Sequence, residues 1–289
     1  MRMSTVLPAG AAMLCLLALP VGAPARAAEV KNLDAPIAAG SKLSYRQLVK
    51  KVFPGAKDAG PGRMEVADTK LLRRPGTRER TQVDEGMLLT AFDARWVRGD
   101  GRRNLLLSWS AVEAANKDDT ALDTPFVVAV IPEGMSEPQD VADLKLDRFM
   151  SLSDKLLALG PDDGFIVSGR HHNAGQGYLL EGLFHIRDGR LHRIDEIFAL
   201  NVSAGCVNTF TEAVNWRTEP DAAAPYPRIV ATVTRQVGPD PEDHCPGKSA
   251  HRKAETYTGS WRWDGARKAY AVENDAELKR LAAINEKNL

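Results

Sequence analysis

The sequence predicts a mainly β protein, a β-rich α+β fold with antiparallel sheets, one short helix near the N-terminus and one short helix at the C-terminus. Apolar runs of strand length follow one another without a helical pattern between them. Three pairs of these runs flank the Asp-Gly turns at 100–101, 188–189 and 264–265, and Asp-Gly is a strong signal for a β-hairpin. Strands joined by short turns pair antiparallel, since a parallel pair needs a long crossover connection.

The composition is that of an ordinary globular protein. The chain has 289 residues, of which 44% are hydrophobic and 26% are charged, which excludes a collagen, a coiled coil or a wholly disordered chain. Its 38 lysines and arginines equal its 38 aspartates and glutamates. Because there is no basic excess, we expect no nucleic-acid partner.

The N-terminus has the features of an export signal over residues 1–27. Arg2 gives it a positive start, residues 10–19 form an apolar run, and the Ala-Arg-Ala at 25–27 is a small-x-small cleavage pattern. We expect cleavage before Ala28 and a periplasmic mature protein. An N-terminal membrane anchor is the alternative, but the apolar run is shorter than the roughly 20 residues that span a bilayer.

Two further observations concern the relation of the chain to the membrane. Cys15 raises the possibility of a lipoprotein, although Leu14 stands where the lipoprotein motif has a small residue. Removing Arg2 and Arg26 with the signal leaves 36 basic and 38 acidic residues. No later stretch contains 18 consecutive apolar residues, so we expect no membrane span in the mature chain.

The mature chain keeps two cysteines, Cys206 and Cys245. In an oxidising compartment they are most simply interpreted as one disulfide. The alternative is a metal site, because His244 adjoins Cys245 and His251 follows it. No Cys-x-x-Cys or His-x-x-x-His spacing supports that alternative.

Along the mature chain, residues 28–42 carry few large apolar side chains and are predicted to be a mobile leader. Residues 43–289 contain no Gly/Ser-rich or Pro-rich linker, which favours a single β-rich globular domain. A helix is predicted after Ser44, which forms a capping box with Gln47. A second short helix is predicted over 275–288.

Between the helices the pattern is that of strands. The predicted strands are 88–97, 104–109, 126–131, 165–168, 179–187, 190–197, 229–237, 257–263 and 269–273. The run at 126–131 is apolar throughout, which is typical of a strand buried on both faces.

The densest polar cluster lies at 171–178, between a buried strand and the next hairpin. Its polar members are His171, His172, Asn173, Gln176 and Tyr178. Two imidazoles, two amides and a phenol could bind a sugar, a metal or a peptide edge. The alternative is a structural loop whose amides hydrogen-bond the backbone of nearby turns.

This cluster carries a resemblance. The pattern His172-Asn173-x-x-Gln176-x-Tyr178, followed by a glycine-turn hairpin, is similar to one found in uncharacterised bacterial exported proteins. The resemblance covers residues 160–206, and it implies no particular activity.

The hairpin at 188–189 generates a second candidate site. A two-residue turn there places His185 opposite His192, with Cβ atoms about 5 Å apart. Two imidazoles at that distance could share a divalent metal, with Asp195 or Glu196 nearby. The alternative is a solvated sheet face, since Arg187 and Arg190 on the same face would repel a cation.

The sequence contains no recognisable catalytic constellation. We therefore expect a soluble periplasmic, non-enzymatic binding or envelope-associated protein without a cofactor. Its partner would be an envelope protein or a small-molecule ligand. One alternative is a metal-assisted periplasmic hydrolase that uses the 171–178 cluster. Another is an inhibitor or partner-binding protein that uses an exposed edge strand.

The disulfide gives a direct prediction. We expect non-reducing peptide mapping of the exported protein to find Cys206 joined to Cys245. Replacing either residue with Ser is expected to lower the free energy of unfolding by about 2 to 5 kcal/mol, the usual cost of losing a native bridge. Two free thiols in protein taken from the periplasm would contradict the pairing and favour the metal alternative.

Overall fold

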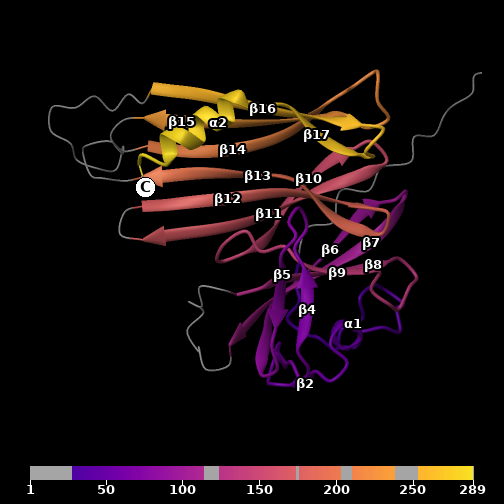
Figure 1. Cartoon of the computed structure of the whole chain (residues 1–289). Coiled ribbons are helices and arrows are strands. Elements are labelled where there is room, and N and C mark those ends of the chain that lie inside the picture. Colours follow the sequence, from indigo (N-terminus) through magenta and orange to yellow (C-terminus); the bar gives the residue numbers. More distant parts are fainter. Residues whose placement is uncertain (1–27, 114–123, 174–175, 203–209, 238–252, 289) are drawn as a thin grey trace, which may run out of the picture.

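The computed structural model describes residues 28–113, 124–173, 176–202, 210–237 and 253–288. Two large sheets pack against each other, and two short helices lie at the outer ends of the molecule (Figure 1). The mainly β fold class with one N-terminal and one C-terminal helix is thus confirmed. Among the described residues, no helix is long and apolar enough to cross a bilayer.

The first sheet is built from the N-terminal half of the chain. Its strands are β1 (Ala28–Glu29), β2 (Lys57–Asp58), β3 (Met64–Glu65), β4 (Lys70–Arg73), β5 (Arg80–Val83), β6 (Met87–Gly99), β7 (Arg102–Glu113), β8 (Phe126–Pro132) and β9 (Asp140–Asp143). Their order is β2-β3-β6-β7-β8-β9-β4-β5, and β1 also pairs with β6. The pairing of β4 with β9 is parallel, and the other pairings found in the described part of this sheet are antiparallel.

The second sheet is an antiparallel meander of eight strands, in which each strand pairs with the next one along the chain. These strands are β10 (Ser151–Leu159), β11 (Asp162–Asn173), β12 (Gln176–Arg187), β13 (Arg190–Val202), β14 (Phe210–Glu219), β15 (Arg228–Val237), β16 (Lys253–Asp264) and β17 (Ala269–Asn274).

The two helices begin near the residues that the sequence predicts. Helix α1 (Tyr45–Val52) has the predicted capping box, with the side chain of Ser44 accepting from the Gln47 backbone and the Gln47 side chain accepting from the Ser44 backbone. Helix α2 (Ala276–Asn285) lies across the second sheet and buries Leu281 against it.

Two hydrophobic clusters, one between the two sheets and one beneath α1, together explain the apolar run of β8. All seven residues of β8 are buried. Alternate residues point to opposite faces of a strand. Thus Val128 packs against the second sheet, beside Phe165 and Phe184, while Val127 and Ala129 enter the core beneath α1. Both faces of β8 are covered, as predicted from its composition.

The tip of the β6–β7 hairpin locks onto the second sheet. The Asp100 carboxylate accepts the backbone N–H groups of Asp188 and Gly189, at 2.9 and 2.7 Å, in the turn between β12 and β13. The Arg98 guanidinium donates to Asp163 at 2.7 Å. A Cβ atom added to Gly99 would lie 2.6 Å from the Cβ of Ile186, so this approach requires a glycine.

A second contact of the same kind lies beside the first. Asp140 pairs with Arg73 within the first sheet, and its Oδ2 accepts the Leu191 backbone N–H at 2.7 Å. Arg73 also donates to the Leu191 carbonyl at 2.9 Å. Carboxylates at a hairpin tip and at a strand end of the first sheet thus accept hydrogen bonds from backbone groups of the second sheet.

Some sequence expectations need correction. Residues 28–42, expected to be a mobile leader, belong to the folded core, because β1 pairs with β6 and both Val30 and Leu33 are buried. The strand predicted at 165–168 is longer and extends over β11. The short strands β2 to β5, the strands β9 and β10, and β14 have no counterpart in the sequence prediction. Five of them, β2 to β5 and β9, are only two to four residues long, which is too short to show a clear alternation.

The lock at the turn gives a matched test. Asp100→Asn is expected to lower the free energy of unfolding by about 1 to 2 kcal/mol, because an amide offers one acceptor oxygen to two N–H groups and carries no charge. Asp188→Asn is the control. Asp188 also has a positive φ in an Asp-Gly turn, but its carboxylate is largely exposed, so a change below about 0.5 kcal/mol is expected. Equal losses of unfolding free energy in the two variants, measured in urea, would contradict the role of the Asp100 contact.

Candidate functional site

The cluster at 171–178 forms the tip of the hairpin between β11 and β12. Asn173 pairs with Gln176 across the hairpin, so the segment expected to be a connecting loop is a pair of strand ends. His171 lies opposite Tyr178 and stacks on it, with ring centroids 5.0 Å apart. The side chains of His172, Asn173 and Gln176 lie outside the described part of the structure, so their predicted role in ligand binding stays a prediction.

Tyr178 links this hairpin to the connection between β9 and β10. The pKa of Tyr178 is raised to about 12, mainly by burial and also by its hydrogen bond to the Asp147 carboxylate. Strand β11 also packs closely against the connection between β9 and β10. A Cβ atom added to Gly169 would lie 2.6 Å from the Met150 sulfur and 3.1 Å from the Arg148 carbonyl. Residues 147–150 are thus held against β11.

Beside this connection lies a cavity of about 320 Å³, here named the junction cavity. It is lined by Thr90, Ala91, Ser110, Val112, Thr124, Phe126, Asp147, Arg148, Phe149 and Met150. The lining combines three hydroxyl groups, five apolar side chains and one pair of opposite charges. This mixture of apolar surface with a few polar groups is typical of small-molecule sites, and the volume is at the lower end of their range.

Two residues of the junction cavity have strained backbones. Ala91 has a φ of 52° and Phe149 has a φ of 48°, in the left-handed region that favours glycine. Ala91 lies in the irregular stretch of β6 between Thr90 and Asp93. Phe149 exposes 59% of its surface. Strained non-glycine residues cluster at functional sites, and here they lie on two walls of one cavity.

Arg148 is the one cation in the described lining of the junction cavity, and Asp147 beside it is the one acid. Within the described residues its guanidinium has no carboxylate within ion-pair distance, although it is partly buried. Asp147, its neighbour, has a buried Oδ2 that lacks a hydrogen-bond partner among the same residues. The cavity thus offers a cation to a ligand, next to an aromatic ring.

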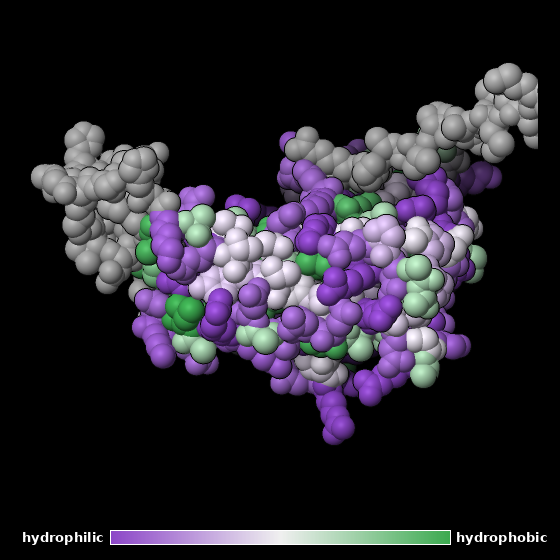
Figure 2. Space-filling model, turned by 90° about the horizontal axis from the view of Figure 1, so that it is seen from above, coloured by the Kyte–Doolittle hydropathy of each residue, from purple (hydrophilic) through white to green (hydrophobic). Residues whose placement is uncertain are grey.

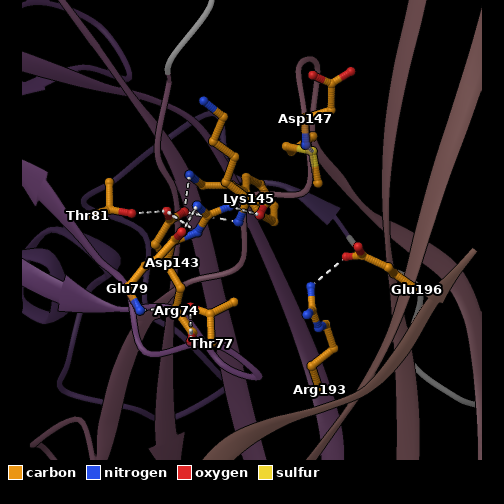
Figure 3. A network of polar contacts seen from close by, with 11 residues as sticks. Arg74, Thr77, Glu79, Thr81, Asp143, Lys145, Asp147, Arg193 and Glu196 are labelled. Carbon is orange, nitrogen blue, oxygen red and sulfur yellow. Dashed lines mark hydrogen bonds and ion pairs between the residues drawn. The ribbon is translucent and has the colours of Figure 1, made fainter. Parts of the chain in front are cut away.

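A buried carboxylate holds the chain in place just before this wall (Figure 3). Asp143 accepts from the hydroxyl of Thr81 at 2.6 Å and from the backbone N–H groups of Phe126 and Lys145 at 2.9 and 3.0 Å. Arg74 lies 3.7 Å from the same carboxylate. Asp143 therefore has its partners within the protein, and we interpret it as a structural residue that positions the connection to β10.

The histidine pair has the predicted register. His185 lies opposite His192, Ile186 opposite Leu191 and Arg187 opposite Arg190. The imidazole centroids of the pair are 5.8 Å apart. The pKa of His185 is lowered to about 3, mainly by burial and also by the neighbouring His192 and Arg187. The pKa of His192 is also lowered, by burial and by Arg73.

The surroundings of this pair differ from the expected solvated face. His185 is buried and Leu183 is fully buried, because Tyr270 of β17 and the second-sheet core pack over them. Asp195 accepts the Trp261 indole N–H at 2.7 Å, and Glu196 pairs with Arg193. The expected auxiliary metal ligands are thus engaged elsewhere.

Within the described residues, no three His, Cys, Asp or Glu side chains are grouped so that they could hold a metal ion. The metal prediction at His185 and His192 remains without a third ligand there. Cys206 and Cys245 lie outside the described residues, so the predicted disulfide stays a prediction.

Sequence reasoning missed the residues that line the junction cavity. Arg148 and Phe149 lie in a connection without any periodic pattern, and Ala91 lies inside a predicted strand. The cavity forms where β6, β7, β8 and the β9–β10 connection meet, and no local signal marks such a junction.

Comparison of the chain with family models, with curated proteins and with solved structures found no match.

The histidine pair gives a prediction about pH. The folded-state pKa of His185, about 3, lies below its unfolded value of about 6.5. The unfolded chain therefore binds the extra proton as the pH falls through that value, and stability is lost. Relative to His185→Phe, the wild type is expected to lose about 2 kcal/mol of unfolding free energy between pH 7 and pH 5. Urea unfolding at several pH values would measure this difference. If the unfolding free energies of wild type and His185→Phe change equally with pH, the prediction is contradicted.

Proposed function

We propose that the chain is an exported, non-enzymatic binding protein of the cell envelope, and that the junction cavity receives a small amphipathic molecule with an anionic group. The observation that carries the proposal is the pairing of strain with exposure at Phe149. An exposed aromatic residue held at a φ of 48° beside a cavity of about 320 Å³ has no evident packing role. A ligand-binding role accounts for both features.

The composition of the cavity supports the class of ligand. Val112, Phe126 and Met150 supply an apolar surface, and Phe149 extends it toward the solvent. Arg148 supplies a positive charge that pairs with no carboxylate of the described chain. An anionic group on the ligand would give this guanidinium a partner. The hydroxyl groups would orient the ligand through hydrogen bonds.

The proposed location has its own support. Cleavage before Ala28 would leave β1 in the mature chain, where Ala28 and Glu29 pair with Ala94 and Asp93 of β6. The expected processing is thus compatible with the described fold. The disulfide between Cys206 and Cys245, which an oxidising compartment would permit, remains part of the proposal.

Two other classes have less support. A metal-assisted hydrolase would need ligands that the described residues do not group together. A protein-docking surface would be expected as a contiguous apolar patch. The face seen in Figure 2 is mostly hydrophilic, and its hydrophobic residues are scattered in small patches. A small-molecule ligand in a cavity therefore fits this surface better.

The test uses the fluorescent anion 8-anilinonaphthalene-1-sulfonate as a probe of the folded mature protein. Phe149→Asn is expected to weaken probe binding, because the aromatic wall is lost. The same variant is expected to raise the free energy of unfolding by about 1 kcal/mol, because asparagine tolerates a positive φ better than phenylalanine does. Arg148→Gln is expected to weaken binding with little change in stability.

Met135→Asn is the matched control. Met135 is exposed to a similar extent, 54%, in the connection after β8, away from the cavity lining. This variant is expected to leave probe binding unchanged. If the Phe149 and Arg148 variants bind the probe as tightly as the wild type does, the junction cavity is not the site. Fluorescence titration and urea unfolding provide the two measurements.

A further inference from the structure

A second cavity, of about 160 Å³, lies between the tips of the β12–β13 and β16–β17 hairpins. We name it the hairpin cavity. Its lining residues are His185, Arg187, Asp188, His192, Arg193, Ile194, Arg267, Lys268, Ala269 and Tyr270. It lies at the opposite end of β12 from Tyr178 and the junction cavity, so it is separate from the proposed ligand site.

The wall of the hairpin cavity carries more positive than negative charge. Four of its side chains are arginine or lysine, and one, Asp188, is acidic. Glu196 and Asp264, which pair with Arg193 and Arg267, are not part of the lining. Lys268 has no ion-pair partner among the described residues and is held at a φ of 50°. This distribution creates a positive potential in a partly enclosed space.

Arg187 has a fixed position in this wall. Its guanidinium stacks on the ring of Trp263, with the Cζ atom 4.4 Å from the ring centroid. Its Nε lies 3.5 Å from the Asp188 carboxylate, whose side chain is 78% exposed. Nε and Nη1 are buried and have no hydrogen-bond partner among the described residues. Buried arginine donors without partners are rare and require an explanation.

His185 contributes a buried polar group to the same wall. The residue is only 4% exposed, and its ring contacts are edge or tilted contacts with His192 and Tyr270. No hydrogen bond of its imidazole to another described residue is found. A neutral imidazole has one N–H donor and one acceptor. It can therefore donate a hydrogen bond to a ligand in the cavity.

We propose that the hairpin cavity binds a small free oxyanion of the size of phosphate or sulfate. Arg187 and Lys268 would supply charge, and the neutral imidazole of His185 would supply an N–H donor. The imidazole of His192 is already hydrogen-bonded to the Arg187 backbone and lines the cavity beside it. Arginine matches the geometry of oxyanions because its donors form a planar fork, and hydrogen bonds to a charged acceptor are about twice as strong as neutral ones.

The same field disfavours a divalent metal at the histidine pair. Burial is the main cause of the lowered pKa values of the two imidazoles. The positive charge of Arg187 adds to it at His185, and that of Arg73 adds to it at His192, where Asp140 and Asp188 act in the opposite direction. A potential that opposes a proton on these rings opposes a divalent cation more strongly, since the interaction energy scales with charge. It favours an anion for the same reason.

The position of the wall is fixed by the contacts between the sheets. The turn that carries Asp188 is bound by the Asp100 carboxylate, and the backbone of Leu191 is bound by Asp140. A site whose residues lie on strands held at both sides needs little reorganisation to bind its ligand. This rigidity favours a small ligand of defined shape.

The test is isothermal titration of the mature protein with sodium phosphate, and separately with sodium sulfate, in a Tris chloride buffer of low ionic strength. The wild type is expected to bind at least one of them at one site per chain. Lys268→Glu is expected to raise the Kd about tenfold or more, because it reverses a charge at the wall. Arg187→Gln is expected to abolish binding.

Lys287→Glu is the matched control, with the same charge reversal at an exposed residue after α2. It is expected to keep the Kd within about twofold of the wild type. Because Arg187 packs on Trp263, thermal unfolding checks that the Arg187 variant is folded. If that variant does not fold, the Kd of the Lys268 variant tests the proposal. Absence of oxyanion binding to folded wild type would overturn the proposal. So would an equal Kd in the Lys268 and Lys287 variants, or zinc binding that requires His185 and His192.

Discussion

Hydrogen bonds from backbone turns of one sheet to carboxylates of the other fix how the two halves of the molecule fit together. Asp100 accepts two N–H groups of the turn between β12 and β13, and Asp140 accepts one of β13 itself. Asp162 and Asp163 reciprocate, by accepting the Gly101 and Arg98 backbone N–H groups. Hydrophobic packing between the sheets is strong but does not select one alignment, whereas these directional bonds do. The same bonds hold the turn between β12 and β13, whose residue Asp188 lines the hairpin cavity.

Local chemistry made much of the second sheet predictable. A two-residue Asp-Gly turn sets the register of a hairpin, so the pairing of His185 with His192 follows from the sequence alone and is confirmed. The environment of that pair was not predictable. Whether the outer face of a hairpin meets water depends on strands far along the chain, and here Tyr270 covers it. The same limit applies to residues 28–42. Their few apolar side chains, Val30 and Leu33, are enough to anchor the segment once β6 is in place.

The junction cavity shows why sites at junctions escape sequence reasoning. Its aromatic wall, Phe149, has no motif, and its strain is visible only as a dihedral angle. The polar cluster at 171–178, predicted as a ligand site, lies next to the junction cavity but does not line it. Tyr178 touches the connection that forms the wall, so part of the predicted site supports the cavity from behind. The residues that we expect to contact a ligand, Arg148 and Phe149, come from a segment that no pattern distinguished.

The two sheets differ in how far apart along the chain their partners lie, and this has a consequence for the order of folding. In the second sheet each strand pairs with the strand before it, so pairing can proceed step by step with short loops to close. In the first sheet the hairpin of β4 and β5 finds its neighbour only when β9 arrives, which places Arg73 beside Ala142. Until then one edge of this early hairpin is unpaired, although its Leu72 and Val83 side chains belong to the same core cluster as the earlier helix α1. In a chain exported N-terminus first, as we propose, residues 70–83 would emerge with this edge unpaired, and an unpaired strand edge is a site of wrong association that a chaperone would protect.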